Sequence, residues 1–344
     1  MSNDFIEIDG SEGEGGGQIV RSSLTLSIAT GRPVRIANVR AGRRKPGLMR
    51  QHLTAVRAAA TIGAAEVEGD AIGSTALTFR PTAVVPGEHR FAVGTAGSAT
   101  LVLQTVLPVL LTADRPSRLT LEGGTHNPFA PPFEFLDRAF LPLVNRMGPR
   151  VSASLEACGF YPAGGGRFVV DVTPAPALTG LELLERGEPV GHHAVALVAN
   201  LDHRIAEKEL AVVTERLGWP EDRLRVASVA GPGPGNVLLL TVEHQHVAEV
   251  FTGFGEVRRS AKAVGNLAVD QARAYLAGDA PVGPFLADQL LLPCALAAAG
   301  GALSAYRITR VTRHLSTHLG LVRRFLPVEA RAAGGSTVRV EPIG

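Results

Sequence analysis

Hydrophobic and polar positions change their period across a run of glycines near the start of the chain. Over residues 6–9 apolar and polar side chains alternate, and over residues 18–26 apolar ones recur every three to four positions. A period of two is typical of a strand and a period of 3.6 of a helix. The pattern therefore predicts a strand, a glycine loop at residues 10–17 and a helix.

A similar order of elements is predicted three times along the chain. In the first copy the helix is followed by a strand at 33–38, a helix at 46–63, and strands at 65–68 and 76–80. The second copy, at 89–172, includes a helix at 132–148, and the third copy is predicted at 284–340. Recurrence of the same elements indicates repeated structural units.

The third copy closes late, which indicates an insertion. A proline closes each copy, and the second and third of these prolines are nearly twice as far apart as the first and second. Within the excess, the pattern predicts a strand, a helix and two strands, flanked by segments that carry glycine and proline. We therefore expect an α/β protein with a large domain of residues 1–180 and 279–344 and a smaller α/β domain inserted at 181–278.

Composition places the chain among ordinary globular proteins. It has 344 residues, of which 45% are hydrophobic, and this length suggests about two domains. A net charge of +2 does not demand a polyanionic partner, although residues 40–50 form a local basic cluster. Two cysteines are too few for a disulfide framework, and neither a signal sequence nor a membrane-spanning run is visible. We expect a cytoplasmic protein that does not contact membranes.

The glycine loop at residues 10–17 is a candidate phosphate site, because backbone amides and a helix N-terminus can converge there on an anion. No Lys-Ser/Thr pair follows the glycines, and Gln18 stands where a dinucleotide fingerprint has its third glycine. Glu12 and Glu14 would repel a phosphate unless a divalent cation lay between them. The loop therefore predicts a combined metal and phosphate site, and a solvated surface turn is the alternative.

Three segments of the sequence resemble the RNA 3′-terminal phosphate cyclases. Residues 8–18, IDGSEGEGGGQ, together with Arg21 resemble the N-terminal signature of that family. Residues 159–166, GFYPAGGG, resemble its glycine motif, and residues 313–327, RHLSTHLGLVRRFLP, resemble the segment with its adenylylated histidine. The resemblance implies a large domain of three units, each similar to the C-terminal domain of translation initiation factor 3, and a smaller inserted domain.

Two positions depart from the family pattern. Cys158 stands where a basic residue usually precedes the glycine motif, and Arg313 stands where the family often has a small residue. A glycine run between two strands is often a bulged hairpin, so we expect a backbone role for the motif and no catalytic role for Cys158.

The resemblance implies a set of site residues. Spacing from the sequence RFLP at 324–327 places the covalently adenylylated histidine at His314 and not at His318. Matching positions for nucleotide contacts are Gln104, Phe285, Leu286, Ala287, Asp288 and Gln289. Matching positions for the RNA terminal phosphate are Arg21, Arg43 and Gln51, with Arg40 and His52 as further candidates, and Glu14 would lie near Mg²⁺ or Mn²⁺.

These residue types suit the chemistry. A neutral imidazole can attack phosphorus when one ring nitrogen is unprotonated, and this favours a neighbour that accepts a hydrogen bond from the other nitrogen. Asp288 is the candidate that orients His314 or the nucleotide, and a helix N-terminus and Arg313 would disfavour the imidazolium form. Without the resemblance, His314 reads as a helix cap and Asp288 and Gln289 as ordinary polar residues at a helix start. Phe129, Pro131 and Phe135 fit either an adenine wall or the core.

The expected function is ATP-dependent conversion of an RNA 3′-terminal phosphate to a 2′,3′-cyclic phosphodiester through a covalent His–AMP intermediate. The alternatives are a non-catalytic family member that binds partners in ribosomal RNA processing, and a sugar enolpyruvate transferase with repeated α/β units. A zinc hydrolase built on His244 and His246 lacks an obvious third ligand.

Overall fold

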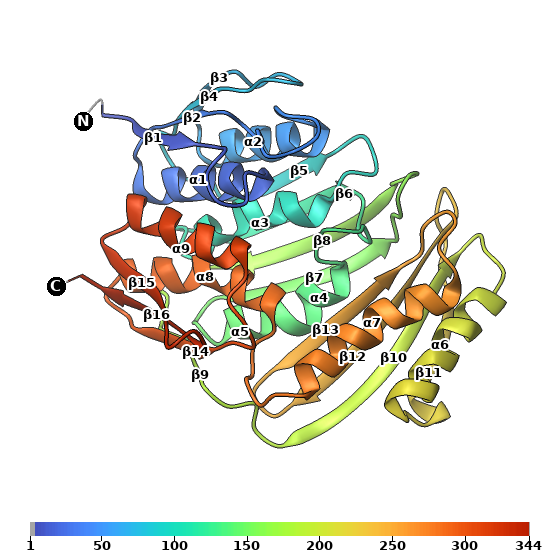
Figure 1. Ribbon diagram of the computed structural model, residues 1–344. Coiled ribbons are helices and arrows are strands. Elements are labelled where there is room, and N and C mark those ends of the chain that lie inside the picture. The colour runs from blue at the N-terminus through green and yellow to red at the C-terminus, as the bar shows by residue number, and fades with distance from the viewer. Residues whose placement is uncertain (1–3, 344) are drawn as a thin grey trace.

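The structure, a computed structural model that describes residues 4–343, contains four four-stranded sheets (Figure 1). Three of them share one strand order, β1-β2-β4-β3, β5-β6-β8-β7 and β9-β14-β16-β15. In each, the first two strands are parallel and the other two pairs are antiparallel. The predicted α/β fold of repeated units with an inserted domain is confirmed.

The elements of the three repeated units follow the predicted order, except that β9, the first strand of unit 3, is absent from the sequence prediction. Unit 1 contains β1 (Ile6–Asp9), α1 (Gly17–Thr30), β2 (Val34–Ala37), α2 (Arg50–Ile62), β3 (Glu66–Glu68) and β4 (Leu77–Arg80). Unit 2 contains β5 (Glu88–Ala92), α3 (Ala99–Leu110), β6 (Ser117–Gly123), α4 (Phe133–Phe135), the π-helical segment η1 (Leu136–Phe140), α5 (Leu141–Asn145), β7 (Arg150–Ala157) and β8 (Gly166–Thr173). Unit 3 contains β9 (Glu182–Leu183), α8 (Pro284–Ala299), β14 (Ser304–Arg307), α9 (Arg313–Phe325), β15 (Val328–Ala333) and β16 (Thr337–Pro342).

The helix predicted at 132–148 is divided into three parts. Pro142 has no N–H to donate, and the turn before it is π-helical, with the Leu141 N–H bonded to the Leu136 carbonyl. Unit 3 is divided as well, because its first strand, β9, pairs in parallel with β14 across the insertion. The domain limits at 180/181 and 278/279 stay a prediction.

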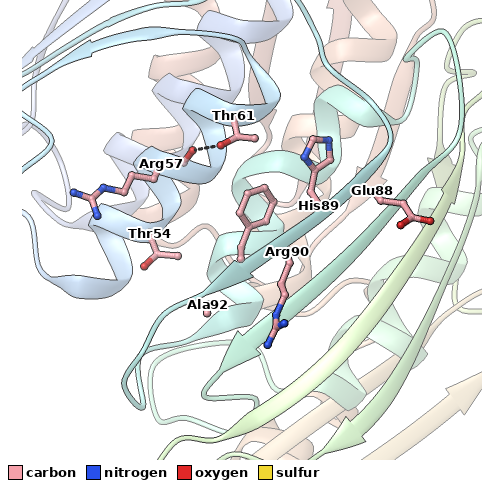
Figure 2. A pocket seen from close by; sticks show the side chains of 8 residues that line it. Thr54, Arg57, Thr61, Glu88, His89, Arg90 and Ala92 are labelled. Carbon is pink, nitrogen blue, oxygen red and sulfur yellow. Dashed lines mark hydrogen bonds between the residues drawn. The ribbon is translucent and has the colours of Figure 1, made fainter.

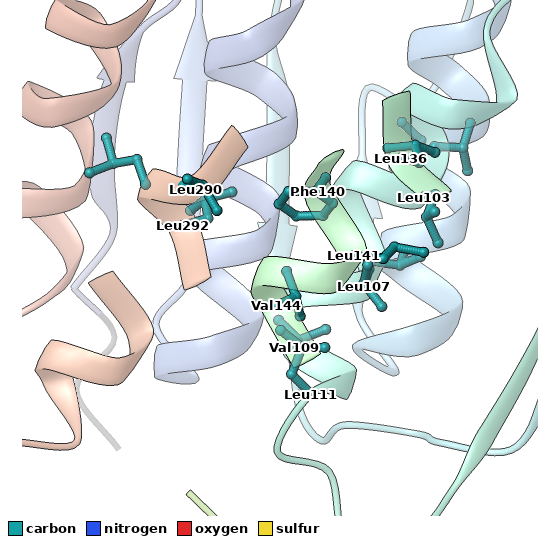
Figure 3. Packing of buried hydrophobic residues seen from close by; sticks show 14 of the residues in the cluster. Leu103, Leu107, Val109, Leu111, Leu136, Phe140, Leu141, Val144, Leu290 and Leu292 are labelled. Carbon is teal, nitrogen blue, oxygen red and sulfur yellow. The ribbon is translucent and has the colours of Figure 1, made fainter. Parts of the chain in front are cut away.

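Helices of different units pack on one another between the sheets. Helix α1 packs against α9, α3 against α2, and α8 against η1, so each contact joins two units. Leu103 and Leu107 of α3 lie in the same buried cluster as Phe140 of η1, Leu141 of α5 and Leu290 of α8 (Figure 3). The first helices of the three units therefore share one core.

The inserted domain has its own sheet and its own core. Its elements are β10 (Pro189–Ala199), α6 (Arg204–Leu217), η2 (Glu221–Arg223), β11 (Leu224–Ser228), β12 (Gly235–His244), β13 (Ala248–Phe254) and α7 (Ala261–Leu276). Ala194 and Ala196 of β10 face α6 and α7, whereas Val195 and Leu197 join the core of the large domain. Alternate residues of β10 thus serve two different cores.

Three of these elements, the short η2, β13 and α7, are absent from the sequence prediction. Glu249 and Gly253 interrupt the apolar alternation of β13, and Gly265 and Asn266 lower the helix propensity of α7. Packing explains the glycine at position 265, since a β-carbon there would lie 2.8 Å from Val212 Cβ on α6. Among residues 4–343, no helix is long and apolar enough to cross a membrane.

Candidate active site

The glycine loop connects β1 to α1, as the sequence predicts. Gly13 and Gly15 have positive φ angles of 55° and 61°, which side chains rarely adopt. A β-carbon on Gly17 would lie 2.5 Å from His52 Nε2, and one on Gly16 would lie 2.2 Å from Glu14 Oε2. Because glycine has no side chain, Gly16 and Gly17 leave room for the His52 and Glu14 side chains next to the start of α1.

His314 meets the glycine loop from the other end of the chain. It is the second residue of α9, whose start is capped by Thr312 Oγ1 accepting from the Leu315 N–H at 3.0 Å. Its Nδ1 lies 3.0 Å from Oε1 of Gln18, the second residue of α1. The structure thus joins two predicted regions of the site across 296 positions.

Gln18 also contacts Asp288, and this contact sets the direction of its amide. Gln18 Nε2 donates to Asp288 Oδ1. Burial acts to raise the pKa of Asp288, but the hydrogen bond from His318, the His318 and His314 imidazoles and the Gln18 amide outweigh it and lower the pKa. An ionised carboxylate only accepts hydrogen bonds, so Gln18 must turn its Oε1 toward His314.

This geometry selects one tautomer of His314. Because Gln18 Oε1 only accepts, His314 Nδ1 carries the proton and Nε2 keeps its lone pair. Nε2 lies 3.7 Å from Glu14 Oε1. Asp288, predicted to orient His314 or the nucleotide, reaches His314 through Gln18.

The surroundings also favour the neutral form of His314. Burial is the largest influence that lowers its pKa, Asp288 opposes it, and Arg43 and Arg21 lower the pKa further. Arg313, whose charge was expected to disfavour the imidazolium form, is exposed and is not among the main influences on this pKa.

Glu14 has the properties of a ligand for a shared metal ion. Its carboxylate is paired with the Arg43 guanidinium, and its Oε2 is buried without a hydrogen-bond partner among residues 4–343. Within the same residues, no three His, Cys, Asp or Glu side chains gather as a metal cluster. Mg²⁺ commonly binds one or two carboxylates together with substrate phosphates, and Glu14 fits that arrangement.

A chain of hydrogen bonds connects the first helices of all three units. Arg21 Nε on α1 donates to Gln104 Oε1 on α3 at 2.9 Å, and Gln104 Nε2 donates to Gln289 Oε1 on α8 at 3.0 Å. Burial lowers the pKa of Arg21 to about 10, against the opposing effect of Asp288, so the guanidinium stays charged at neutral pH. A residue predicted for RNA phosphate therefore contacts one predicted for the nucleotide.

The other residues predicted to bind the RNA phosphate differ in charge and accessibility. Gln51 Oε1 accepts from the Ser98 N–H at 3.1 Å, just before α3. Burial, followed by Arg21, Arg40 and Arg43, lowers the pKa of His52 to about 3, so His52 is neutral and supplies no positive charge. Arg40 is buried and donates to the carbonyls of Lys45 and Gly47, so it braces the loop instead of facing a ligand.

The predicted nucleotide segment at the start of α8 is only partly accessible. The Phe285 side chain is 59% exposed, whereas the side chains of Leu286 and Ala287 are fully buried. The Ala287 N–H donates to the Gly283 carbonyl at 3.0 Å, so its amide is not free for a ligand. Of these two residues, only Leu286 could offer a backbone amide of the first helical turn. Phe129 is fully exposed and Phe135 lies in the core, so these two aromatics do not form one wall.

The glycine motif at 159–166 has a packing role in the structure. A β-carbon on Gly164 would lie 2.9 Å from Ala96 Cα, and one on Gly165 would lie 2.6 Å from Pro232 of the inserted domain. Burial raises the pKa of Cys158 to about 12, which leaves its thiol unreactive.

Three side chains in the site were given no role from the sequence. His318 is buried beside Asp288, Ser22 is buried beside His318, and Thr317 Oγ1 accepts from the Glu14 N–H at 3.1 Å. A signal was present, because Ser22 follows Gln18 by four positions and His318 follows His314 by four. Residues at that spacing share one helical face.

A separate hollow lies between α2 and β5 and contains none of the candidate site residues (Figure 2). Its arginines, Arg57 and Arg90, form ion pairs with Asp70 and Glu122. This hollow is therefore not a free basic groove.

Comparison with known proteins places the chain in a family. A sequence profile described as RNA 3′-terminal phosphate cyclase matches residues 12–332. The RNA 3′-terminal phosphate cyclase of Ectopseudomonas mendocina (strain ymp) is 52% identical over 330 residues, which is 96% of this chain and 95% of that protein. The protein of the same name from Koribacter versatilis (strain Ellin345) is 49% identical and covers 94% of this chain and 90% of its own length.

Among solved structures, the enolpyruvyl transferase NikO from Streptomyces tendae aligns with 99% of this chain at 13% identity and a TM-score of 0.41. The alignment spans about half of that structure, 49% of its length. The family profile and the close relatives, in contrast, extend over nearly the whole sequence. The chain therefore belongs to the RNA 3′-terminal phosphate cyclase family.

Proposed function

We propose that this protein uses ATP to convert the 3′-terminal phosphate of an RNA into a 2′,3′-cyclic phosphodiester. Relatives about half identical to it carry the cyclase name. The observation that carries the proposal is the hydrogen bond between Gln18 Oε1 and His314 Nδ1, which leaves Nε2 as the nucleophilic nitrogen.

In the first step, His314 Nε2 attacks the α-phosphorus of ATP. A nitrogen–phosphorus bond forms, the bond from that phosphorus to the bridging oxygen breaks, and pyrophosphate leaves. Gln104, Gln289 and the first turn of α8 position the nucleotide. A Mg²⁺ or Mn²⁺ ion held by Glu14 would neutralise charge on the phosphates.

In the second step, an oxygen of the RNA 3′-phosphate attacks the phosphorus of the His–AMP adduct, and the bond to His314 breaks. Arg21, Arg43 and Gln51 hold the terminal phosphate, since planar guanidinium groups match its oxygens. The neighbouring 2′-hydroxyl then attacks the activated 3′-phosphorus, loses its proton and expels AMP. Both groups are on one ribose, so proximity favours closure of the ring.

Labelling with ATP that carries its label on the α-phosphate tests the first step. The wild-type protein should acquire an acid-labile label, and His314→Ala should not. His246→Ala, a change of an exposed histidine in the inserted domain, is the matched control and should label normally. Labelling that persists in His314→Ala would end the proposal, and an unlabelled wild-type protein would favour a non-catalytic family member or an enolpyruvate transferase.

Substitution of Arg43 separates the two steps. The test is made at a pH well above the ordinary histidine pKa of 6.5, so that a rise of the His314 pKa on removal of Arg43 has little effect on labelling. Under this condition Arg43→Ala should label with AMP at close to the wild-type rate. Its cyclisation of RNA should fall on the order of tenfold or more, because a charge-assisted contact is lost. Arg44→Ala, an exposed neighbour in the same loop, is the control. Equal loss of both activities would contradict the role of Arg43 in binding RNA phosphate.

We also infer a cytoplasmic location for the protein. Both cysteines, Cys158 and Cys294, are buried free thiols. Unpaired thiols are typical of a reducing compartment.

A further inference from the structure

His318 lies one helical turn after His314 on α9 and is held at both ring nitrogens. Its Nδ1 is 3.0 Å from Asp288 Oδ1, and its Nε2 is 3.0 Å from Ser22 Oγ. The ring is 1% exposed, so it cannot reach a ligand directly. Any part that it has in the reaction must be transmitted through Asp288 or Ser22.

Asp288 Oδ1 receives two donors, Gln18 Nε2 and His318 Nδ1. The lowered pKa of Asp288 keeps it ionised, so His318 Nδ1 must carry a proton. The 3.3 Å distance between Gln18 Nε2 and His318 Nδ1 is then the separation of two donors that share one acceptor. The Ser22 hydroxyl can donate to or accept from Nε2, so it holds the ring in either case.

We propose that His318, held by Ser22, is a positioning residue for His314, acting through Asp288 and Gln18 to keep the nucleophile in the tautomer with a free Nε2. This inference rests on the proposed function. His318 fixes the Asp288 oxygen that orders the Gln18 amide, and the ordered amide presents its carbonyl to His314 Nδ1. An amide turned the other way would offer a donor to Nδ1, place the proton on Nε2 and block attack on phosphorus.

Substitutions of His318 test this role with two measurements. His318→Leu removes the donor to Asp288 and fills the space with an apolar side chain, whereas His318→Asn retains an N–H near the position of Nδ1. The first measurement is the rate of His314 labelling by ATP in a single turnover, over a range of ATP concentrations. The second is the tautomer of His314, read from the ¹⁵N shifts of labelled histidine in the protein without ATP.

The wild-type protein should show His314 protonated on Nδ1. In His318→Leu the labelling rate at saturating ATP should fall on the order of 10–100-fold, the loss typical of partners that orient a metal-ligating histidine. The dependence on ATP concentration should be nearly unchanged, and His314 should lose the fixed Nδ1–H form. His318→Asn should restore most of the rate and the tautomer.

His126→Leu is the matched control, because His126 is another buried histidine held at both nitrogens, by Thr125 and Glu134 at 2.8 Å each. It should leave the tautomer of His314 unchanged. If His318→Leu does not fold, Ser22→Ala removes one hydrogen bond from the same ring and should lower the rate in the same direction.

Three results would overturn the inference: His314 protonated on Nε2 in the wild-type protein, a wild-type labelling rate in folded His318→Leu, or equal loss in His318→Leu and His318→Asn. A wild-type protein that never labels contradicts the proposed function instead. The ¹⁵N measurement still tests the tautomer in that case, so the two failures are distinguishable.

Discussion

The His314 imidazole is open on one side and held by the protein on the other. Its side chain is 51% exposed, whereas that of His318 is fully enclosed. A group that attacks phosphorus needs an accessible lone pair on a fixed ring. The contrast favours His314 over His318 as the nucleophile, in agreement with the spacing from residues 324–327.

The pH dependence of self-adenylylation should reflect the lowered pKa of His314. The folded-state pKa lies below the ordinary 6.5, so the neutral nucleophile persists as the pH falls below 6.5. We expect the single-turnover labelling rate, measured over about pH 5 to 8, to fall with a midpoint below 6.5. In Arg43→Ala the midpoint should rise, because a cation that lowers this pKa is removed. A wild-type midpoint at or above 6.5 would count against this account.

The role of a residue could be predicted where a sequence motif contains it. It could not be predicted where the role depends on which side chains pack together in the fold. The glycine signature pointed to Glu14 and Arg21, and the C-terminal motif pointed to His314. For Ser22 and His318 the only signal was a spacing of four residues, which indicates a shared helical face but not a partner. Their meeting depends on how α1 packs against α9. The neutral state of His52 could not be predicted from the sequence either, because it follows from burial among three arginines.

At the scale of elements, the start of α1 is shaped by close approach. Gly17 is the first residue of the helix, and the space beside it is taken by His52 and Arg21. The strand, loop and helix around it were predictable from period and glycine content. The close contact between Gly17 and His52 was not predictable, because His52 belongs to a different helix, α2.

Gly17→Ala should lower activity without lowering stability by a comparable amount. The new β-carbon would meet His52 Nε2 at 2.5 Å and Arg21 Nη1 at 2.9 Å, so both side chains must shift. A misplacement of about 1 Å in a site can cost on the order of 100-fold, and we expect cyclisation to fall by about 10- to 100-fold. Steady-state cyclisation and thermal unfolding are the measurements.

Gly320→Ala is the control for this change. Gly320 lies within α9 and has nothing within 4 Å of its missing β-carbon. It should keep wild-type activity and gain up to about 1 kcal/mol of stability from the higher helix propensity of alanine. If Gly17→Ala cyclises RNA at the wild-type rate, the close contacts at the start of α1 do not matter for activity.

At the scale of the whole molecule, the fold and the family predicted from the sequence are confirmed. The recurring order of elements along the chain was enough to predict the repeated units, because each unit keeps the same strand order. The contacts between units were not predictable, since they join helices far apart in the chain. A different contact connects the inserted domain to the large one: Glu249 Oε1 of β13 accepts from the N–H of Gly283, the residue before α8.

The Glu249 contact should make stability depend on pH. Burial is the main cause that raises the pKa of Glu249, from 4.5 to about 8. An acid with a raised folded-state pKa contributes stability below its unfolded pKa, and this contribution is lost as the pH rises through the folded value. Wild-type stability should therefore decline between pH 4.5 and 8 relative to Glu249→Gln, which keeps the acceptor but cannot ionise.

Urea unfolding of both proteins at several pH values measures this difference. The free energy of unfolding of Glu249→Gln should exceed that of the wild type by an amount that grows by about 1 kcal/mol per pH unit across the window. A difference that does not change with pH would refute the buried, protonated state of Glu249.

The hydrogen-bond chain from Arg21 through Gln104 to Gln289 has a consequence for synthesis of the protein. A ribosome delivers Arg21 early and Gln289 and His314 late, so a nascent chain contains the glycine loop long before it contains the proposed nucleophile. Prematurely terminated products that lack His314 should therefore not react with ATP, and the proposed site is complete only when the last repeat has docked.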